Sequence, residues 1–161
     1  MNIKNFLPLI ILSTLLISCQ EKSNDVITAD LTFKSVSFAN AWKANDEEFK
    51  TFSQELDKSL KNPEKLSENE LAIYTHYDKL RELNLLRSPY IFLNIEKDSV
   101  ITVFLPVKEY EKVKHLNQID LYKEGKKAVL ELELKEKDSN IFYSNSIINV
   151  TKVNGKSRSN I

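Results

Sequence analysis

The chain has 161 residues, with 23 basic and 23 acidic side chains, one cysteine and two glycines. This length is typical of a single domain, and one cysteine cannot form an internal disulfide or a zinc knuckle. Glycine-rich phosphate loops need several glycines close together, so P-loop and dinucleotide-binding sites are excluded. The balanced charge gives no reason to expect a nucleic-acid partner.

The N-terminal segment has the pattern of a secretory signal peptide. Lys4 is the only charged residue before Cys19, and the run from Phe6 to Ile17 is apolar apart from one Ser-Thr pair. A helix that crosses the hydrocarbon of a membrane needs about 20 apolar residues, and this run is shorter. A short positive end followed by an apolar core of this length predicts a signal peptide.

The end of this segment, Leu16-Ile17-Ser18-Cys19, resembles the lipobox of bacterial lipoproteins. In that family a signal peptidase cuts just before the cysteine, whose thiol carries a diacylglycerol, and the new amino group is often acylated. The resemblance implies a signal peptide over 1–18 and palmitate-type acyl chains on Cys19. Two or three such chains hold a protein stably on a membrane. Cleavage as an ordinary secreted protein and a core helix ending in a buried cysteine are the alternatives.

A polar stretch follows the cysteine. Residues 20–30 contain only a small apolar cluster and cannot bury enough surface to order themselves, so we expect a flexible tether over 19–30. In the lipoprotein family an aspartate after the cysteine resembles an inner-membrane retention signal. This chain has Gln20 there, which favours the outer membrane. The charged tether also loosely resembles those of surface-exported lipoproteins, so both a periplasmic and a surface-facing position stay open.

The first half of the expected domain, which spans 31–153, is helical. The segment from Leu31 to Asn45 fits either a strand or a helix turn. Asn45 and Ser67 are good N-caps, and Ser67 forms a capping box with Glu70. Apolar residues then recur at helical spacing, at Phe49, Phe52, Leu56 and Leu60 in the first helix and at Ile73, Tyr77, Leu80 and Leu83 in the second. The short connection between them predicts an antiparallel helix pair.

The second half is strand-rich. We expect strands over Tyr90–Ile95, Val100–Leu105, Ala128–Lys135 and Ile141–Val153, and a short helix over Val107–Leu116. The first two strands are almost continuously apolar, which indicates a sheet covered on both faces. The third alternates, which indicates one wet face. Residues 154–161 form a polar tail.

These elements predict an α+β fold, in which an antiparallel helix hairpin is followed by a β-β-α-β-β antiparallel sheet. The alternative is a small OB-like barrel. Such a barrel has five strands, so the segment from Leu31 to Phe38 would have to supply one of them.

Few residues are candidates for chemistry. His76 and His115 lack a second ligand at metal spacing, and we interpret them as surface or structural residues. The acidic run 46–48 follows a helix N-cap, where the helix dipole explains it. Asp98-Ser99-Val100 resembles the acceptor of periplasmic O-glycosylation in some lipoprotein-rich bacteria, which implies Ser99 as a candidate site. A Gly-x-Ser-x-Gly elbow is absent from the sequence.

We therefore expect a non-catalytic envelope lipoprotein, a small binding or scaffolding module that is anchored through Cys19 and contacts a protein partner in the envelope. We expect no cofactor, no metal and no catalytic residue. Two alternatives stay open. One is an envelope hydrolase whose site is not recognisable from residue spacing. The other, by analogy alone, is a periplasmic immunity or inhibitor lipoprotein.

Overall fold

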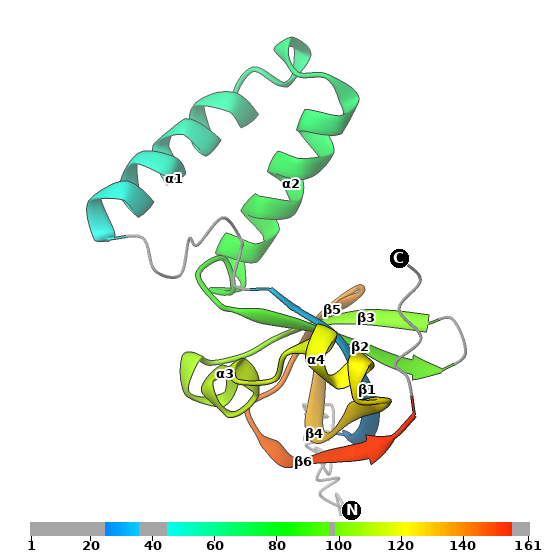
Figure 1. The fold of residues 1–161 in the computed structure, drawn as a ribbon. Helices are drawn as coiled ribbons and strands as arrows, with labels where there is room; N and C mark the ends of the chain where they lie inside the picture. Colours follow the sequence, from blue (N-terminus) through cyan, green and yellow to red (C-terminus); the bar gives the residue numbers. More distant parts are fainter. Residues whose placement is uncertain (1–24, 36–44, 97–98, 156–161) are drawn as a thin grey trace, which may run out of the picture.

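A computed structural model describes residues 25–35, 45–96 and 99–155. The strands are β1 (Asp25–Ser35), β2 (Tyr90–Glu96), β3 (Ser99–Phe104), β4 (Lys126–Asp138), β5 (Ile141–Tyr143) and β6 (Ile147–Asn154). The helices are α1 (Asp46–Leu60), α2 (Glu68–Glu82), α3 (Val107–Lys114) and α4 (Gln118–Lys123), with a 3-10 turn at Pro63–Lys65. The predicted α+β class is confirmed: a six-stranded mixed sheet curls into a partly barrel-like ring, and the pair α1–α2 projects from one end (Figure 1).

The ring arises because β1 pairs with two strands. Its first half, Asp25–Asp30, is antiparallel to β4, and its second half, from Asp30 to Ser35, is antiparallel to β2. β2 pairs with β3, and β4 pairs with β5 through its last residues and with β6 through its first. A parallel pairing of β3 with β5, at Val103 and Phe104, completes the ring.

This arrangement corrects the expected order of elements. A strand precedes the helix pair, and the pairing of β3 with β5 makes the sheet mixed rather than purely antiparallel. The single strand expected over Ile141–Val153 is divided into β5 and β6. The chain turns there because the Ser144 backbone N–H donates to the Phe104 carbonyl and its hydroxyl donates to the Ser146 carbonyl. Helix α4 was not anticipated.

The range predicted for the tether overlaps the folded domain. β1 begins at Asp25, so residues 25–30 belong to the folded domain and not to the tether predicted over 19–30. Ala29 is buried and Ile27 packs against the core, whereas Val26 is 57% exposed. Only alternate residues of a strand face the core. The polar residues at the positions between them made this segment look like a polar tether in the sequence. The predicted tail at 154–161 lies outside the described residues except for Asn154, which ends β6, and Gly155.

The main hydrophobic core fills the ring. Its buried members come from alternate positions of the strands and from α3 and α4: Ala29, Leu31, Ile91, Leu93, Val103, Leu105, Tyr110, Val113, Leu116, Leu121, Ala128, Leu130, Leu132 and Ile147. The predicted inward face of β4, with Ala128, Leu130 and Leu132, is confirmed. Helices α3 and α4 lie between β3 and β4 in the chain and cover one end of the ring through Val113 and Leu121.

A second hydrophobic cluster joins the helix pair to the outside of the sheet. Its buried members are Leu80, Leu85, Leu86, Phe104 and Ile141, and its partly buried members are Phe49, Phe52, Tyr77, Leu83, Tyr90 and Tyr143. Strands β2 and β3 are therefore covered on both faces near the helix pair. This confirms the interpretation of their continuous apolar sequences.

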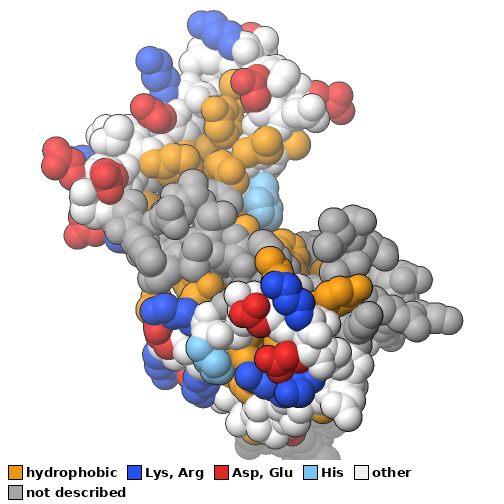
Figure 2. Space-filling view, in the orientation of Figure 1, with side chains coloured by type: hydrophobic (Ala, Val, Ile, Leu, Met, Phe, Trp, Pro, Cys, Tyr) orange, Lys and Arg blue, Asp and Glu red, His pale blue; other side chains and the backbone are white. Residues whose placement is uncertain are grey.

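Both predicted helix caps are confirmed, since the Asn45 and Ser67 side chains each form a capping box. Ile73, however, does not face inward: it is 48% exposed. Tyr74 takes its place between the helices and lies beside residues of α1. The Tyr77 ring contacts Phe52 at 5.9 Å between centroids. Figure 2 shows the apolar side chains gathered along the facing sides of α1 and α2, with charged side chains around them.

Candidate binding surface

Of the residues singled out for chemistry, those that the structure describes lie apart from one another. Cys19 lies outside the described residues. Ser99 is the half-buried first residue of β3, and its neighbour Asp98 is not described. His76 is exposed on α2, and His115 is exposed at the C-cap of α3. Within the described ranges, no group of three or more histidine, cysteine or acidic side chains has a geometry that could hold a metal.

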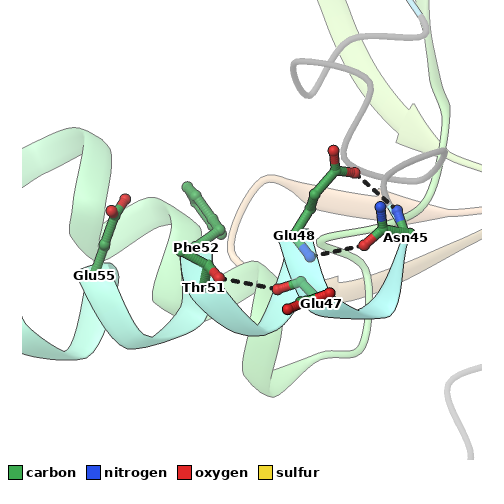
Figure 3. A pocket seen from close by; sticks show the side chains of 6 residues that line it. All are labelled: Asn45, Glu47, Glu48, Thr51, Phe52 and Glu55. Carbon is green, nitrogen blue, oxygen red and sulfur yellow. Dashed lines mark hydrogen bonds between the residues drawn. The ribbon is translucent and has the colours of Figure 1, made fainter.

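A shallow groove of about 420 Å³ lies beside the first turn of α1 (Figure 3). Its polar groups serve the helix itself. The Asn45 side chain accepts from the Glu48 backbone N–H at 2.9 Å, and the Asn45 N–H donates to Glu48 Oε2 at 3.0 Å. Thr51 donates its hydroxyl to the Glu47 carbonyl. Of the acidic run at the start of α1, Glu48 completes the capping box, and the Asp46 carboxylate accepts from Arg87 at 2.9 Å.

A second groove of about 400 Å³ lies between α1 and α2 near the tip of the pair. It is lined by Glu55, Lys58, Ser59, Asn62, Lys65, Leu66 and Tyr74. The Asn62 side-chain amide donates to the Lys58 carbonyl at 3.1 Å. The groove therefore presents two ammonium groups beside a half-buried aromatic ring, and no described histidine or cysteine lies in it.

A third candidate surface is the outer side of β2 and β3. Beyond the part covered by the helix pair, the outward-facing residues are Phe92 opposite Thr102 and Asn94 opposite Val100. We call these four residues the β2–β3 face. Val100 is 54% exposed, and the other three are half-buried. A partly exposed aromatic ring beside polar side chains can contact a partner or ligand, since aromatic residues are enriched at binding hot spots.

Aromatic packing fixes the border between this face and the helix pair. The Tyr90 ring meets Phe92 edge-on at 5.5 Å and lies tilted against Phe104 at the same distance. Tyr143 is packed in the same cluster, and burial raises the pKa of its hydroxyl. The Lys79 ammonium lies 2.5 Å from an Asp138 carboxylate oxygen and links α2 to the end of β4.

The burial of the tyrosines shows which of them are accessible to a binding partner and which belong to the core. Tyr110 is only 3% exposed and belongs to the main core, and Tyr90 and Tyr143 belong to the second cluster. Tyr122 is half exposed, and Tyr74 lines the tip groove. Trp42 lies outside the described residues. The continuous apolar sequences of β2 and β3 could have indicated that Tyr90 is covered by other residues.

The sequence also gave no sign that Glu109 is buried. Its carboxylate accepts from the Ile147 backbone N–H at 2.8 Å and pairs with the Lys112 ammonium at 2.7 Å. Lys112 also donates to the Ile147 carbonyl. Burial raises the pKa of Glu109, but these hydrogen bonds and the nearby lysine charges outweigh that effect and hold the pKa below its usual value. The three groups clamp α3 to the start of β6.

Comparison of the chain with models of protein families, with curated proteins and with solved structures finds no match. Among the described residues, no helix is long and apolar enough to cross a membrane.

Proposed function

We propose that this protein is a non-catalytic envelope lipoprotein, held on the outer membrane by acyl chains on Cys19, whose folded domain is a small binding module. The observation that carries the proposal is the lipobox-like sequence Leu16-Ile17-Ser18-Cys19 after a short apolar segment. Acyl chains on this cysteine would anchor the domain stably without a spanning helix.

Substitution of the cysteine tests the anchor. Cys19→Ala should leave the membrane fraction or accumulate at the mass of the precursor, because the thiol that accepts the lipid is gone. A lipoprotein signal-peptidase inhibitor should also cause the precursor to accumulate. Ser23→Ala, in the same polar segment, is the matched control and should stay on the membrane at the mature mass. A Cys19→Ala protein that stays membrane-bound without a signal-peptide mass difference contradicts the proposal. Protease treatment of intact cells then separates surface from periplasmic exposure.

We further infer that the ring of strands is an OB-like barrel. Support comes from the order of pairings β1-β2-β3-β5-β4 with β1 closing on β4, from the parallel pairing of β3 with β5, and from helices inserted between β3 and β4. The OB architecture is a five-stranded, partly open barrel. In this interpretation the helix pair is an insertion between the first two strands, and β5 with β6 forms one interrupted fifth strand.

The inferred barrel suggests where and what the module binds. OB-type barrels bind oligonucleotides and oligosaccharides through the face of their second and third strands and the adjoining loops, and this step is a fold-level analogy. Here that region is the β2–β3 face. Equal numbers of basic and acidic residues disfavour a polyanionic nucleic acid, whose binding relies on neutralised phosphates. We therefore favour an oligosaccharide of the cell envelope.

Binding of purified envelope glycans to residues 19–161, produced without the signal peptide and with Cys19→Ala so that no lipid is attached, tests this ligand class. Thr102→Arg places a bulky charge in the centre of the β2–β3 face and should abolish binding measured by calorimetry. Val107→Arg, at an exposed position on α3, is the matched control and should bind normally. Absence of glycan binding, together with cross-linking in intact cells to one envelope protein, would refute the glycan ligand and leave a protein-binding module.

A further inference from the structure

The folded domain begins only a few residues after the proposed lipid attachment site at Cys19. β1 begins at Asp25, six residues after Cys19. An extended chain spans at most about 3.3–3.6 Å per residue, so the Cα atoms of these two residues lie within about 22 Å of each other. If Cys19 is acylated, as the proposed function requires, the start of β1 is held close to the bilayer.

The path of β1 shows which end of the domain would lie near the bilayer. Its last residue, Ser35, pairs with Tyr90, which packs in the cluster at the base of the helix pair. A strand rises about 3.3 Å per residue, so the 11 residues of β1 follow a path of roughly 30 Å along the curved sheet from Asp25 to this base. In Figure 1, β1 (blue) runs from the end of the barrel opposite the helix pair up to the base of that pair.

The helix pair packs against the barrel at its base and points away from the start of β1 (Figure 1). The second cluster and the contact between Lys79 and Asp138 hold its base against the sheet. Each helix has 15 residues and, at 1.5 Å per residue, adds about 22 Å beyond this base. Only residues 20–24 separate Cys19 from Asp25, so a lipid on Cys19 would keep the start of β1 within about 22 Å of the lipid attachment point.

Two exposed apolar side chains lie at the anchored end. Val26 is 57% exposed on β1, and Ile148 is 50% exposed where the register of β6 on β4 shifts. Both strands pair with the same part of β4, since Val26 lies opposite Glu133 and the neighbouring Ile147 lies opposite Leu132. The two side chains therefore occupy one region of the barrel surface.

We propose that this region, formed by the start of β1 and the register shift of β6, faces the headgroups of the anchoring bilayer, while the helix pair projects into the aqueous compartment. The groove between α1 and α2, with Lys58, Lys65 and Tyr74, is then the part of the protein farthest from the membrane. The proposal rests on the proposed lipid anchor and adds the orientation of the domain.

Fluorescence quenching on vesicles tests this orientation. The acylated protein carries no other thiol once Cys19 is modified, so Val26→Cys and Lys65→Cys each give one labelling site. In phosphatidylcholine vesicles with headgroup-bound quencher lipids, the label at position 26 should be quenched several-fold more than the label at 65. Equal quenching at both positions, or stronger quenching at 65, would overturn the orientation.

Mass spectrometry of the same preparations distinguishes failure of the proposed lipid anchor from failure of the proposed orientation. A protein that lacks lipid on Cys19 overturns the anchor and the orientation together. An acylated protein with equal quenching overturns the orientation alone. The lipid-free Cys19→Ala protein, labelled at either position, is the background control and should show no difference between the two sites.

Discussion

The clamp formed by Glu109 should contribute strongly to the stability of the domain. This glutamate is 6% exposed and joins α3 to β6 through the Ile147 backbone N–H and the Lys112 ammonium. Substitution Glu109→Ala removes the acceptor of the buried Ile147 backbone N–H, at the start of a strand that contributes Ile147 to the main core. We expect this single change to weaken the attachment of α3 to the barrel.

The size of the effect follows from the groups left behind. A buried donor without an acceptor costs about 1–3 kcal/mol. Lys112 contributes less, because its side chain is 45% exposed and keeps its bond to the Ile147 carbonyl at 2.9 Å. We expect the free energy of unfolding to fall by about 2 kcal/mol, which corresponds to about 6–10 °C in Tm for a domain of this size.

Urea denaturation of the soluble mature chain measures this loss, with Glu111→Ala as the matched control. Glu111 lies on the same helix and pairs with Lys114 at 2.9 Å, but both side chains are substantially exposed. An exposed pair at this spacing contributes only about 0.2–0.5 kcal/mol. If Glu109→Ala is no more destabilising than Glu111→Ala, the carboxylate does not clamp the two elements and the reasoning is wrong.

The clamp also predicts a pH dependence. The pKa of Glu109 is lower in the folded state than its ordinary value, so the ionised carboxylate stabilises the fold above the unfolded pKa. This contribution is lost as the pH falls through the folded pKa. The stability difference between the natural chain and Glu109→Gln should therefore be full at pH 6–7 and shrink below about pH 4. A difference that stays constant down to pH 3 would contradict the ionised clamp.

Three further predictions concern other parts of the molecule. Leu80 is fully buried in the second cluster, so Leu80→Ala should lower the free energy of unfolding, measured by urea denaturation, by about 2–5 kcal/mol. Ile73→Ala, on the exposed side of the same helix, should lower it by less than about 0.5 kcal/mol. Similar losses for the two variants would contradict the packing of the helix pair. Ser67→Ala removes the cap of α2 and should lower the stability by about 1 kcal/mol, visible as an earlier loss of helical circular dichroism. Ser99→Ala should remove any glycan mass from the mature protein, and a glycan that persists in this variant excludes Ser99 as the acceptor.

Local elements were the part of the fold that sequence reasoning could predict. The caps at Asn45 and Ser67, the strands from Tyr90 to Phe104 and the inward face of β4 follow from interactions within a few residues of the chain. Ile73 was placed wrongly because helical spacing defines a stripe but not its centre, and Tyr74 contacts α1 in its place.

The candidate site was less predictable for a related reason. The β2–β3 face exists because the helix pair covers only one part of two apolar strands, and the position of that border depends on Tyr90 and Phe104 meeting residues of α2. Glu109 looked like a surface residue of a short helix, since a charged residue is seldom buried without a partner. Its partner, the Ile147 N–H, is 38 residues away in the chain.

The sequence by itself determined the helix pair and most of the strands, because caps and hydrophobic periodicity are encoded by neighbouring residues, and it is the basis for the proposed anchor at Cys19. Only the tertiary structure decided that β1 starts at Asp25 and that it joins β2 to β4 in a ring. The physical reason is that strand pairing is non-local: Ile27 lies opposite Leu132, and no local pattern specifies which edge a half-polar strand will meet.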